Sequence, residues 1–205
     1  MQSSIYGYHE ICYYIFMSES LTILVDMDGV LANFDAEVIN RIREQYPHIP
    51  IVESRPNIRI PDDYPEHRAL IRGILDQPGF FYSLPLMEHA IEGYERIVDL
   101  GYNPRICSSP VRTNPTSIPE KLAWLERHFA PIFGSYVVEQ AIITEDKHLF
   151  DGRALIDDNP IIKSAGEASW KHIIFDSPHN QRSTGLRLYG WLDQRLPELL
   201  EMAKS

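Results

Sequence analysis

Two aspartates that directly follow a short apolar run are the residues of this chain best suited to chemistry. Asp26 and Asp28 come after residues 21–25, and Gly29 follows them. In a strand, residues two apart share a face, and in an open α/β sheet ligands bind beyond the carboxyl ends of the strands. Both carboxylates are therefore predicted to enter one pocket, where their repulsion requires a divalent cation or a cationic side chain. The alternative is a strand that ends in an ordinary Asp-Gly turn.

Hydroxyl and ammonium groups follow two more apolar runs. Ser108 and Ser109 come after residues 103–107, and Lys147 lies just past residues 142–144. A serine hydroxyl can donate a hydrogen bond to a phosphoryl oxygen, and a compact ammonium suits a phosphate as a point charge. Each group alone has a simpler interpretation, because serines often cap turns and lysines are usually solvated.

An adjacent acidic pair ends a further apolar run. Asp157 and Asp158 follow residues 154–156, a position that is hard to explain as surface. Carboxylate oxygens are the ligands that Mg²⁺ prefers, so Asp26 and Asp158 could share one ion. The four signals in this order favour a phosphate-handling site over four unrelated turns.

In this order the motifs resemble those of the haloacid-dehalogenase-like phosphatases. Longer stretches are similar to the 5'(3')-deoxyribonucleotidases of that superfamily, namely residues 26–34, 79–82, 106–110, 120–126, 170–175 and 179–181. The resemblance covers about residues 21–191, which is nearly the whole chain. It implies a Mg²⁺-dependent phosphatase for (deoxy)nucleoside monophosphates.

The same resemblance implies the roles of the site residues. Asp26 would be the nucleophile that forms an aspartyl-phosphate, and Asp28 would protonate the leaving oxygen and later deprotonate water. Ser108 and Lys147 would hold the phosphoryl oxygens. Asp157 would orient Lys147 or metal-bound water. The implied metal-binding positions are Asp26, Asp28 through its backbone carbonyl, Asp157 and Asp158.

Substrate contacts are also implied by the resemblance. Phe34 and Phe81 stand at the positions that stack the base, with Ser109 and Arg112 beside the phosphate. The alternative is that Phe80, Phe81 and Tyr82 are simply core residues. His179 is the histidine of interest, since its loop follows a strand end.

Two departures from the characterised animal enzymes are predicted to weaken base stacking or to change specificity. Residues 56–60 read PNIRI where those enzymes carry an aromatic pair, and Asn159 stands where they have arginine. A phosphatase for another small phosphomonoester, such as a sugar phosphate, is therefore the alternative function. A non-catalytic nucleotide-binding protein is less favoured, because every catalytic position is retained.

Composition agrees with a soluble enzyme. The chain has 205 residues, of which 44% are hydrophobic and 23% charged, with a formal net charge of -10. This balance argues against binding a nucleic acid polymer. Two cysteines provide no disulfide framework, and no apolar run approaches the ~20 residues of a membrane span. A cytoplasmic protein is expected, and a homodimer is left open.

The predicted fold is α/β, a doubly wound parallel sheet with a small helical cap inserted after the first strand. The catalytic core is assigned to residues 18–34 and 83–205, and the cap to residues 35–82. Strands are expected at 21–25, 105–108, 141–144, 154–156 and 172–175, and helices at 34–46, 66–75, 90–100, 119–129 and from about 185.

Residues 1–17 are interpreted as an N-terminal extension. They lack the basic start, long apolar run and cleavage site of a signal peptide. Met17 lies just upstream of the first predicted strand, so a start at Met17 is one hypothesis.

Overall fold

The computed structural model describes residues 21–203 of the chain. The predictions about residues 1–17, including a start at Met17, lie outside the described residues.

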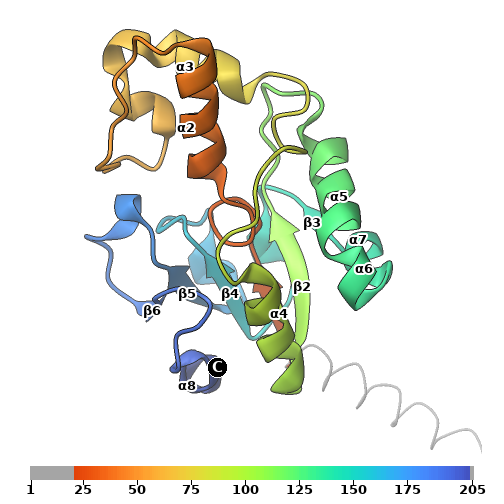
Figure 1. Ribbon diagram of the computed structural model, residues 1–205. Coiled ribbons are helices and arrows are strands. Elements are labelled where there is room, and N and C mark those ends of the chain that lie inside the picture. The colour runs from red at the N-terminus through yellow and green to blue at the C-terminus, as the bar shows by residue number, and fades with distance from the viewer. Residues whose placement is uncertain (1–20, 204–205) are drawn as a thin grey trace, which may run out of the picture.

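A parallel sheet forms the centre of the protein (Figure 1). Its strands are β1 (Thr22–Val25), β2 (Asn103–Ser108), β3 (Ile142–Ile143), β4 (Ala154–Asp157), β5 (Lys171–Phe175) and β6 (Leu186–Leu188), in the spatial order β3-β2-β1-β4-β5-β6. Every neighbouring pair is parallel. All the strands therefore end at the same edge of the sheet, with β1 in the interior.

The two faces of the sheet bury different residues of β1. Ile23 and Val25 pack in the larger hydrophobic cluster, whereas Leu24 packs in a smaller one with Cys107 and Trp170. This alternation follows from the two-residue period of a strand. Because both faces are covered, the three residues of β1 that follow Thr22 are all apolar.

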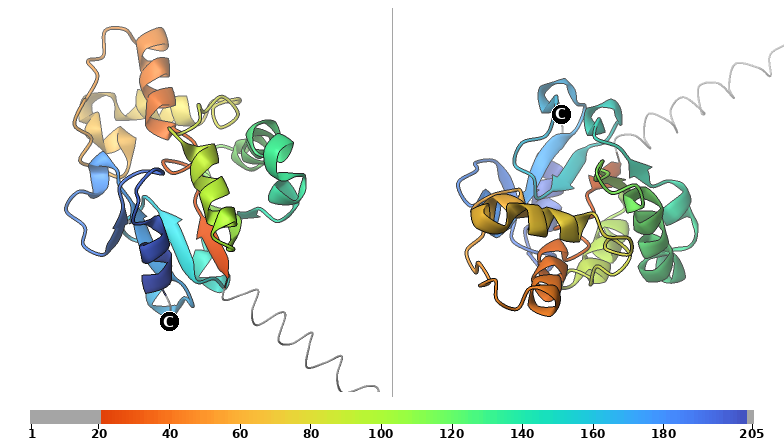
Figure 2. Two further views of the ribbon diagram at one scale, coloured as in Figure 1. Left: turned by 60° about the horizontal axis from the view of Figure 1, so that its bottom comes forward. Right: turned by 90° about the horizontal axis from the view of Figure 1, so that it is seen from above.

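Helices that follow the strands cover the larger cluster. They are α4 (Ala90–Asp99), α5 (Ser117–His128), α6 (Ala130–Phe133), α7 (Tyr136–Glu139) and α8 (Leu196–Met202). Figures 1 and 2 show α4 and α8 on one face of the sheet, with α5 to α7 beside β2. Among residues 21–203, the structure contains no helix with the length and apolar character that a membrane crossing requires.

A helical segment stands at the carboxyl edge of the sheet, between β1 and α4 (Figures 1 and 2). It contains α2 (Phe34–Gln45), α3 (Arg68–Leu75) and 3-10 turns at Ile60–Asp63 and Pro65–His67. Helix α2 begins where Asn33 accepts a hydrogen bond from the Ala36 amide at 3.0 Å, a normal N-cap. The helices expected at 34–46 and 66–75 are thus confirmed to within two residues.

The prediction of a closing helix from about residue 185 is wrong. Leu186–Leu188 instead form β6, the edge strand beside β5, and α8 begins only at Leu196. A strand this short carries too few alternating residues to be recognised in the sequence. The short helices α6 and α7 also went unpredicted.

Trp191, between β6 and α8, ties the end of the chain to the loop after β1. Its indole N–H donates a hydrogen bond of 2.8 Å to the Val30 carbonyl. The ring packs on α4 at Gly93, where an added Cβ would lie 2.3 Å from the indole. Only a glycine at position 93 leaves room for the indole to lie this close to α4. The loop after β1 in turn depends on Trp191 for the hydrogen bond to the Val30 carbonyl.

Candidate active site

The ends of three neighbouring strands bring the predicted catalytic groups together. Val25 of β1 pairs with Ile106 of β2 and Ile156 of β4, so the residues that follow these positions meet at one edge. The Asp26 amide donates to the Ile156 carbonyl at 2.9 Å, which extends the β1–β4 ladder by one residue. The backbone therefore holds Asp26 at the carboxyl end of an interior strand of the sheet.

Three carboxylates converge at this edge. Each of Asp26, Asp157 and Asp158 offers an oxygen, and these oxygens lie within 4.8 Å of one another. Asp157 is fully buried and Asp26 is 7% exposed. The carboxylate of Asp28 is not part of this group, because it turns toward Lys121 at 2.7 Å.

Lys147 is the cation inside the acidic group. Its ammonium lies 3.0 Å from Asp26 Oδ1 and 2.5 Å from Asp157 Oδ2, and its side chain is only 4% exposed. The Asn159 amide donates to the other oxygen of Asp157 at 2.8 Å. Asp157 therefore has both oxygens satisfied, one by the Lys147 ammonium and the other by the Asn159 amide.

Burial and crowding shift the proton equilibria of the site. Burial would lower the pKa of Lys147, but the Asp157 and Asp26 carboxylates outweigh it and raise that pKa. Burial, together with Asp157 and Asp26, raises the pKa of Asp158 well above its usual range. Burial also raises the pKa of Asp28, against the opposing charge of Lys121. When Asp26, Asp157 and Asp158 are all ionised, their negative charge exceeds the single positive charge of the Lys147 ammonium.

The residues present fit a divalent cation. Asp26 Oδ1 and Asp28 Oδ1 are buried oxygens without a hydrogen-bond donor, although Lys147 lies near the first of them. A carboxylate in this position normally finds a donor or a metal ion. Hard oxygen donors and excess negative charge are what a divalent cation requires.

Gly29 shapes the loop that separates Asp26 from α2. Its φ is +75°, and an added Cβ would lie 2.1 Å from Asp158 Oδ2. Only glycine meets both conditions, the left-handed backbone and the close approach of a carboxylate.

Replacing Gly29 with alanine should therefore lower stability and displace Asp158. The left-handed conformation alone costs about 1–2 kcal/mol for a residue with a Cβ. Gly79→Ala is the matched control, because Gly79 also has a positive φ of +84° but no atom within 4 Å of its added Cβ. Thermal melting of both variants measures the difference. Equal losses would contradict a steric role for the Gly29–Asp158 approach.

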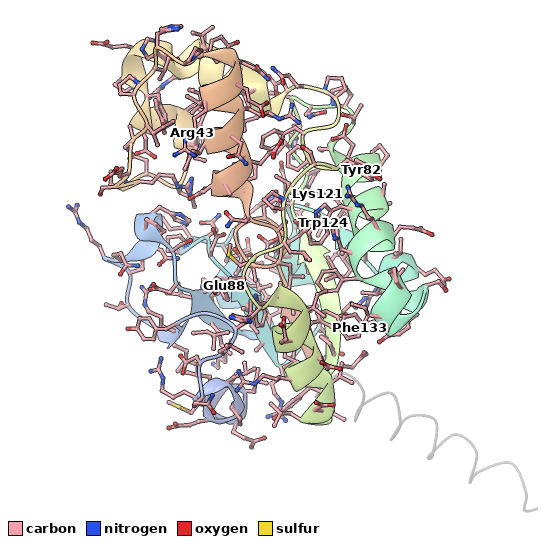
Figure 3. The ribbon with its side chains drawn as sticks, viewed as in Figure 1. Arg43, Tyr82, Glu88, Lys121, Trp124 and Phe133 are labelled. Atoms are coloured by element: carbon pink, nitrogen blue, oxygen red, sulfur yellow. The ribbon has the colours of Figure 1, made fainter. Side chains whose placement is uncertain are left out.

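Lys121 of α5 is a buried cation that sequence reasoning did not place in the site. Its side chain is fully buried, and its ammonium donates to Asp28 Oδ2 at 2.7 Å, Ser108 Oγ at 2.9 Å and the Ser109 carbonyl at 2.8 Å. Figure 3 labels Lys121 and Trp124 on the side of α5 that faces the centre of the molecule. All the donors of Lys121 are satisfied, so it fixes the Asp28 carboxylate and the end of β2 together.

Replacing Lys121 with methionine should destabilise the fold by about 3 kcal/mol, because breaking a buried ion pair leaves a carboxylate unpaired. Urea unfolding measures the loss, and Lys171→Met, at the exposed start of β5, is the control. In the Asp28→Asn background the same substitution should cost at least about 1 kcal/mol less. Identical costs in both backgrounds would show that Lys121 does not act on Asp28.

A pocket of about 630 Å³ opens above the carboxylates. This volume lies in the range of small-molecule sites. The predicted site residues that line it are Asp26, Asp28, Phe34, Ser109, Lys147, Asp157 and Asp158. Among the other residues that line it are Arg55 and Arg59 from the helical segment and His179 from the loop after β5.

Three predicted substrate-binding residues lie off the wall of this pocket. Ser108 is buried beside Lys121, and Phe81 is fully buried, with its ring 6.3 Å from Phe34 and 5.2 Å from the Lys121 ammonium. Arg112 has a side chain that is 78% exposed and pairs with Glu145 through Nε at 2.7 Å. Phe81 therefore supports the pocket from behind, while the Arg112 guanidinium is engaged at the surface.

Comparison with known proteins shows the family. The chain matches the family described as "5' nucleotidase, deoxy (Pyrimidine), cytosolic type C protein" over residues 19–204. It is 39% identical over 178 residues to a Bordetella pertussis protein assigned as a 5'(3')-deoxyribonucleotidase, covering 85% of this chain and 94% of the relative. It is 34% identical over 190 residues to the human 5'(3')-deoxyribonucleotidase of cytosolic type, covering 86% and 92%.

Solved structures confirm the α/β fold. A magnesium-bound Bacillus subtilis protein assigned to the HAD-hydrolases superimposes with a TM-score of 0.51 at 12% identity, covering 86% of this chain and 97% of that one. The resemblance to the 5'(3')-deoxyribonucleotidases inferred from the motifs is therefore confirmed by the family match and the relatives. The chain belongs to the 5' nucleotidase, deoxy (pyrimidine), cytosolic type C family.

Proposed function

We propose that the protein is a phosphoric monoester hydrolase that converts (deoxy)nucleoside monophosphates to nucleoside and phosphate. The observation that carries the proposal is the group of Asp26, Lys147, Asp157 and Asp158 at the floor of a nucleotide-sized pocket. Relatives named 5'(3')-deoxyribonucleotidases over nearly the whole chain support this substrate class.

Asp26 acts as the nucleophile and Asp28 as the acid–base group. An Asp26 oxygen attacks phosphorus, the bond from phosphorus to the nucleoside oxygen breaks, and Asp28 gives that oxygen a proton. Water then attacks phosphorus, gives a proton to Asp28, and frees phosphate from Asp26. Burial raises the pKa of Asp28, which favours the protonated form that the first step needs.

Lys147 and Ser108 stabilise the transferred phosphoryl group. The Lys147 ammonium already touches Asp26, so it lies beside any phosphoryl group bonded there. The Ser108 hydroxyl accepts from Lys121 and therefore keeps its own proton for a phosphoryl oxygen. Interactions that strengthen as charge develops contribute most to phosphoryl transfer.

The cation would be Mg²⁺, and Asp26, Asp158 and the backbone carbonyl of Asp28 would hold it. When bound, it neutralises the repulsion between the nucleophile and the phosphate dianion. Asp157, whose oxygens are already occupied by Lys147 and the Asn159 amide, contributes to the site by orienting Lys147.

Residues 35–82 act as the cap, and the described part of residues 18–34 and 83–205 forms the core beneath it. Phe34 lines the pocket at the start of α2 and supplies the aromatic surface for the base, with Ser109 beside the phosphate. We place the protein in the cytoplasm, in line with the human relative of cytosolic type.

Phosphate release tests the proposal. The panel comprises dUMP, dTMP, UMP, 3'-dUMP, AMP, a sugar phosphate and p-nitrophenyl phosphate, each with Mg²⁺ and with EDTA. Metal-dependent preference for the nucleotides supports the proposal. Activity confined to the sugar phosphate or the generic ester would retain the chemistry and reject the substrate class.

A further inference from the structure

Arg55 reaches from the cap to the core across the rim of the pocket. It lies between α2 and the first 3-10 turn, yet its side chain is only 11% exposed. Its Nε lies 3.0 Å from the Asp35 carboxylate in the first turn of α2. A terminal nitrogen of the same guanidinium contacts His179 Nδ1 at 2.5 Å. The planar guanidinium thus spans two partners from different parts of the fold.

The contact with Arg55 determines which His179 nitrogen carries a proton. An arginine only donates, so Nδ1 must accept and Nε2 must be the N–H donor. His179 Nε2 lies 3.0 Å from the Asp158 carbonyl and 3.5 Å from its carboxylate Oδ2. The His179 side chain is 1% exposed and held between these two contacts. A continuous chain of contacts therefore runs from Asp35 through Arg55 and His179 to Asp158.

We propose that Arg55 is a positioning residue for the divalent cation, because it orients His179, which in turn holds Asp158. This inference rests on the proposed function only in treating Asp26 and Asp158 as cation ligands. Groups that orient a metal ligand typically change metal affinity by ~10–100-fold when removed. The cap thereby contributes to the cation site without providing a ligand.

An effect of charge alone would change metal affinity in the direction opposite to an effect of positioning. The direction of the change in metal affinity when Arg55 is removed therefore tests the inference. A guanidinium near Asp158 repels a divalent cation, so its removal should raise metal affinity if only Coulombic forces act. If Arg55 acts by positioning, its removal should lower metal affinity. Arg59 is the matched control, since it lies on the same loop and lines the same pocket, but its guanidinium makes no hydrogen bond or ion pair within residues 21–203.

The experiment measures Mn²⁺ binding to the full-length protein, without substrate, by the electron paramagnetic resonance signal of free Mn²⁺. Arg55→Met should weaken binding by about tenfold. Arg59→Met should leave binding unchanged or slightly tighter. His179→Ala should weaken binding at least as much as Arg55→Met, and the double variant should resemble His179→Ala, because both residues act in series. Circular dichroism confirms that each variant is folded.

The outcomes separate this inference from the proposed function. Unchanged or tighter binding in Arg55→Met, or additive losses in the double variant, overturns the inference while leaving the nucleotidase proposal intact. Absence of Mn²⁺ binding by the wild-type protein overturns both the cation site and this inference. If His179→Ala does not fold, the comparison of Arg55→Met with Arg59→Met still decides by sign.

Discussion

Replacing Asp26 with asparagine should abolish phosphate release while leaving the fold intact. The amide is nearly the size of the carboxylate and keeps the backbone hydrogen bond to Ile156, but it cannot attack phosphorus. Loss of a nucleophile that works with other groups lowers kcat by about 10⁴-fold or more. Steady-state phosphate release and far-ultraviolet circular dichroism measure the two parts of this result.

Chemical trapping identifies the nucleophile directly. Borohydride reduces an aspartyl-phosphate to homoserine, so wild-type protein quenched during turnover should carry homoserine at position 26 by peptide mass spectrometry. Asp62→Asn is a matched control, since Asp62 is half-buried in the helical segment, pairs with Arg68 and does not line the pocket. Homoserine at another aspartate, or normal activity in Asp26→Asn, would refute the assignment.

Chelation of divalent metal should also remove activity, and it should lower the thermal stability. Asp26, Asp157 and Asp158 share one ammonium, so a bound cation relieves repulsion that the metal-free fold must tolerate. At a Mg²⁺ concentration about 100 times Kd, binding adds about 2.7 kcal/mol of stability, or about 5–10 °C in Tm for a chain of this size. Differential scanning calorimetry with Mg²⁺ and with EDTA measures the shift.

The same calorimetry applied to Asp158→Asn tests where the cation binds. This variant loses one charged ligand but retains the shape of the side chain that approaches Gly29. Its metal-free Tm should rise, because one of the repelling carboxylates is gone, and its Mg²⁺-induced shift should fall. A shift as large as in the wild-type protein would place the cation elsewhere.

The acidic site could be predicted from the sequence because its residues end apolar strands. Asp26, Asp157 and Lys147 each lie at or just past a run that reads as a strand, and parallel strands end at one edge. Side chains two residues apart share a face of the sheet, and parallel strands end at one edge. These two rules are sufficient to predict that such residues lie close together. The group of acidic residues and Lys147 could therefore be predicted without knowing the structure of residues 35–82.

Lys121 and Arg55 could not be recognised as site residues by the same reasoning. Lys121 occurs in a helix with many charged residues, and its partner Asp28 is 93 positions away in the chain. Arg55 lies in a loop without periodicity, 124 positions from His179. Local sequence patterns carry no signal for such distant partners. The similarity of residues 120–126 to the deoxyribonucleotidases was the one available clue to Lys121.

The bond between Trp191 and Val30 has a consequence for the order in which the protein matures. These residues are 161 positions apart, and the Val30 carbonyl belongs to the turn that follows Asp26 and Asp28. Contacts of such long sequence separation form late, because the intervening chain must be ordered first. During synthesis, chains grow from the N-terminus and domains fold as units. A nascent chain still lacking Trp191 would carry Asp26, Lys147, Asp157 and Asp158, while the loop after β1 would lack one hydrogen bond of the folded protein.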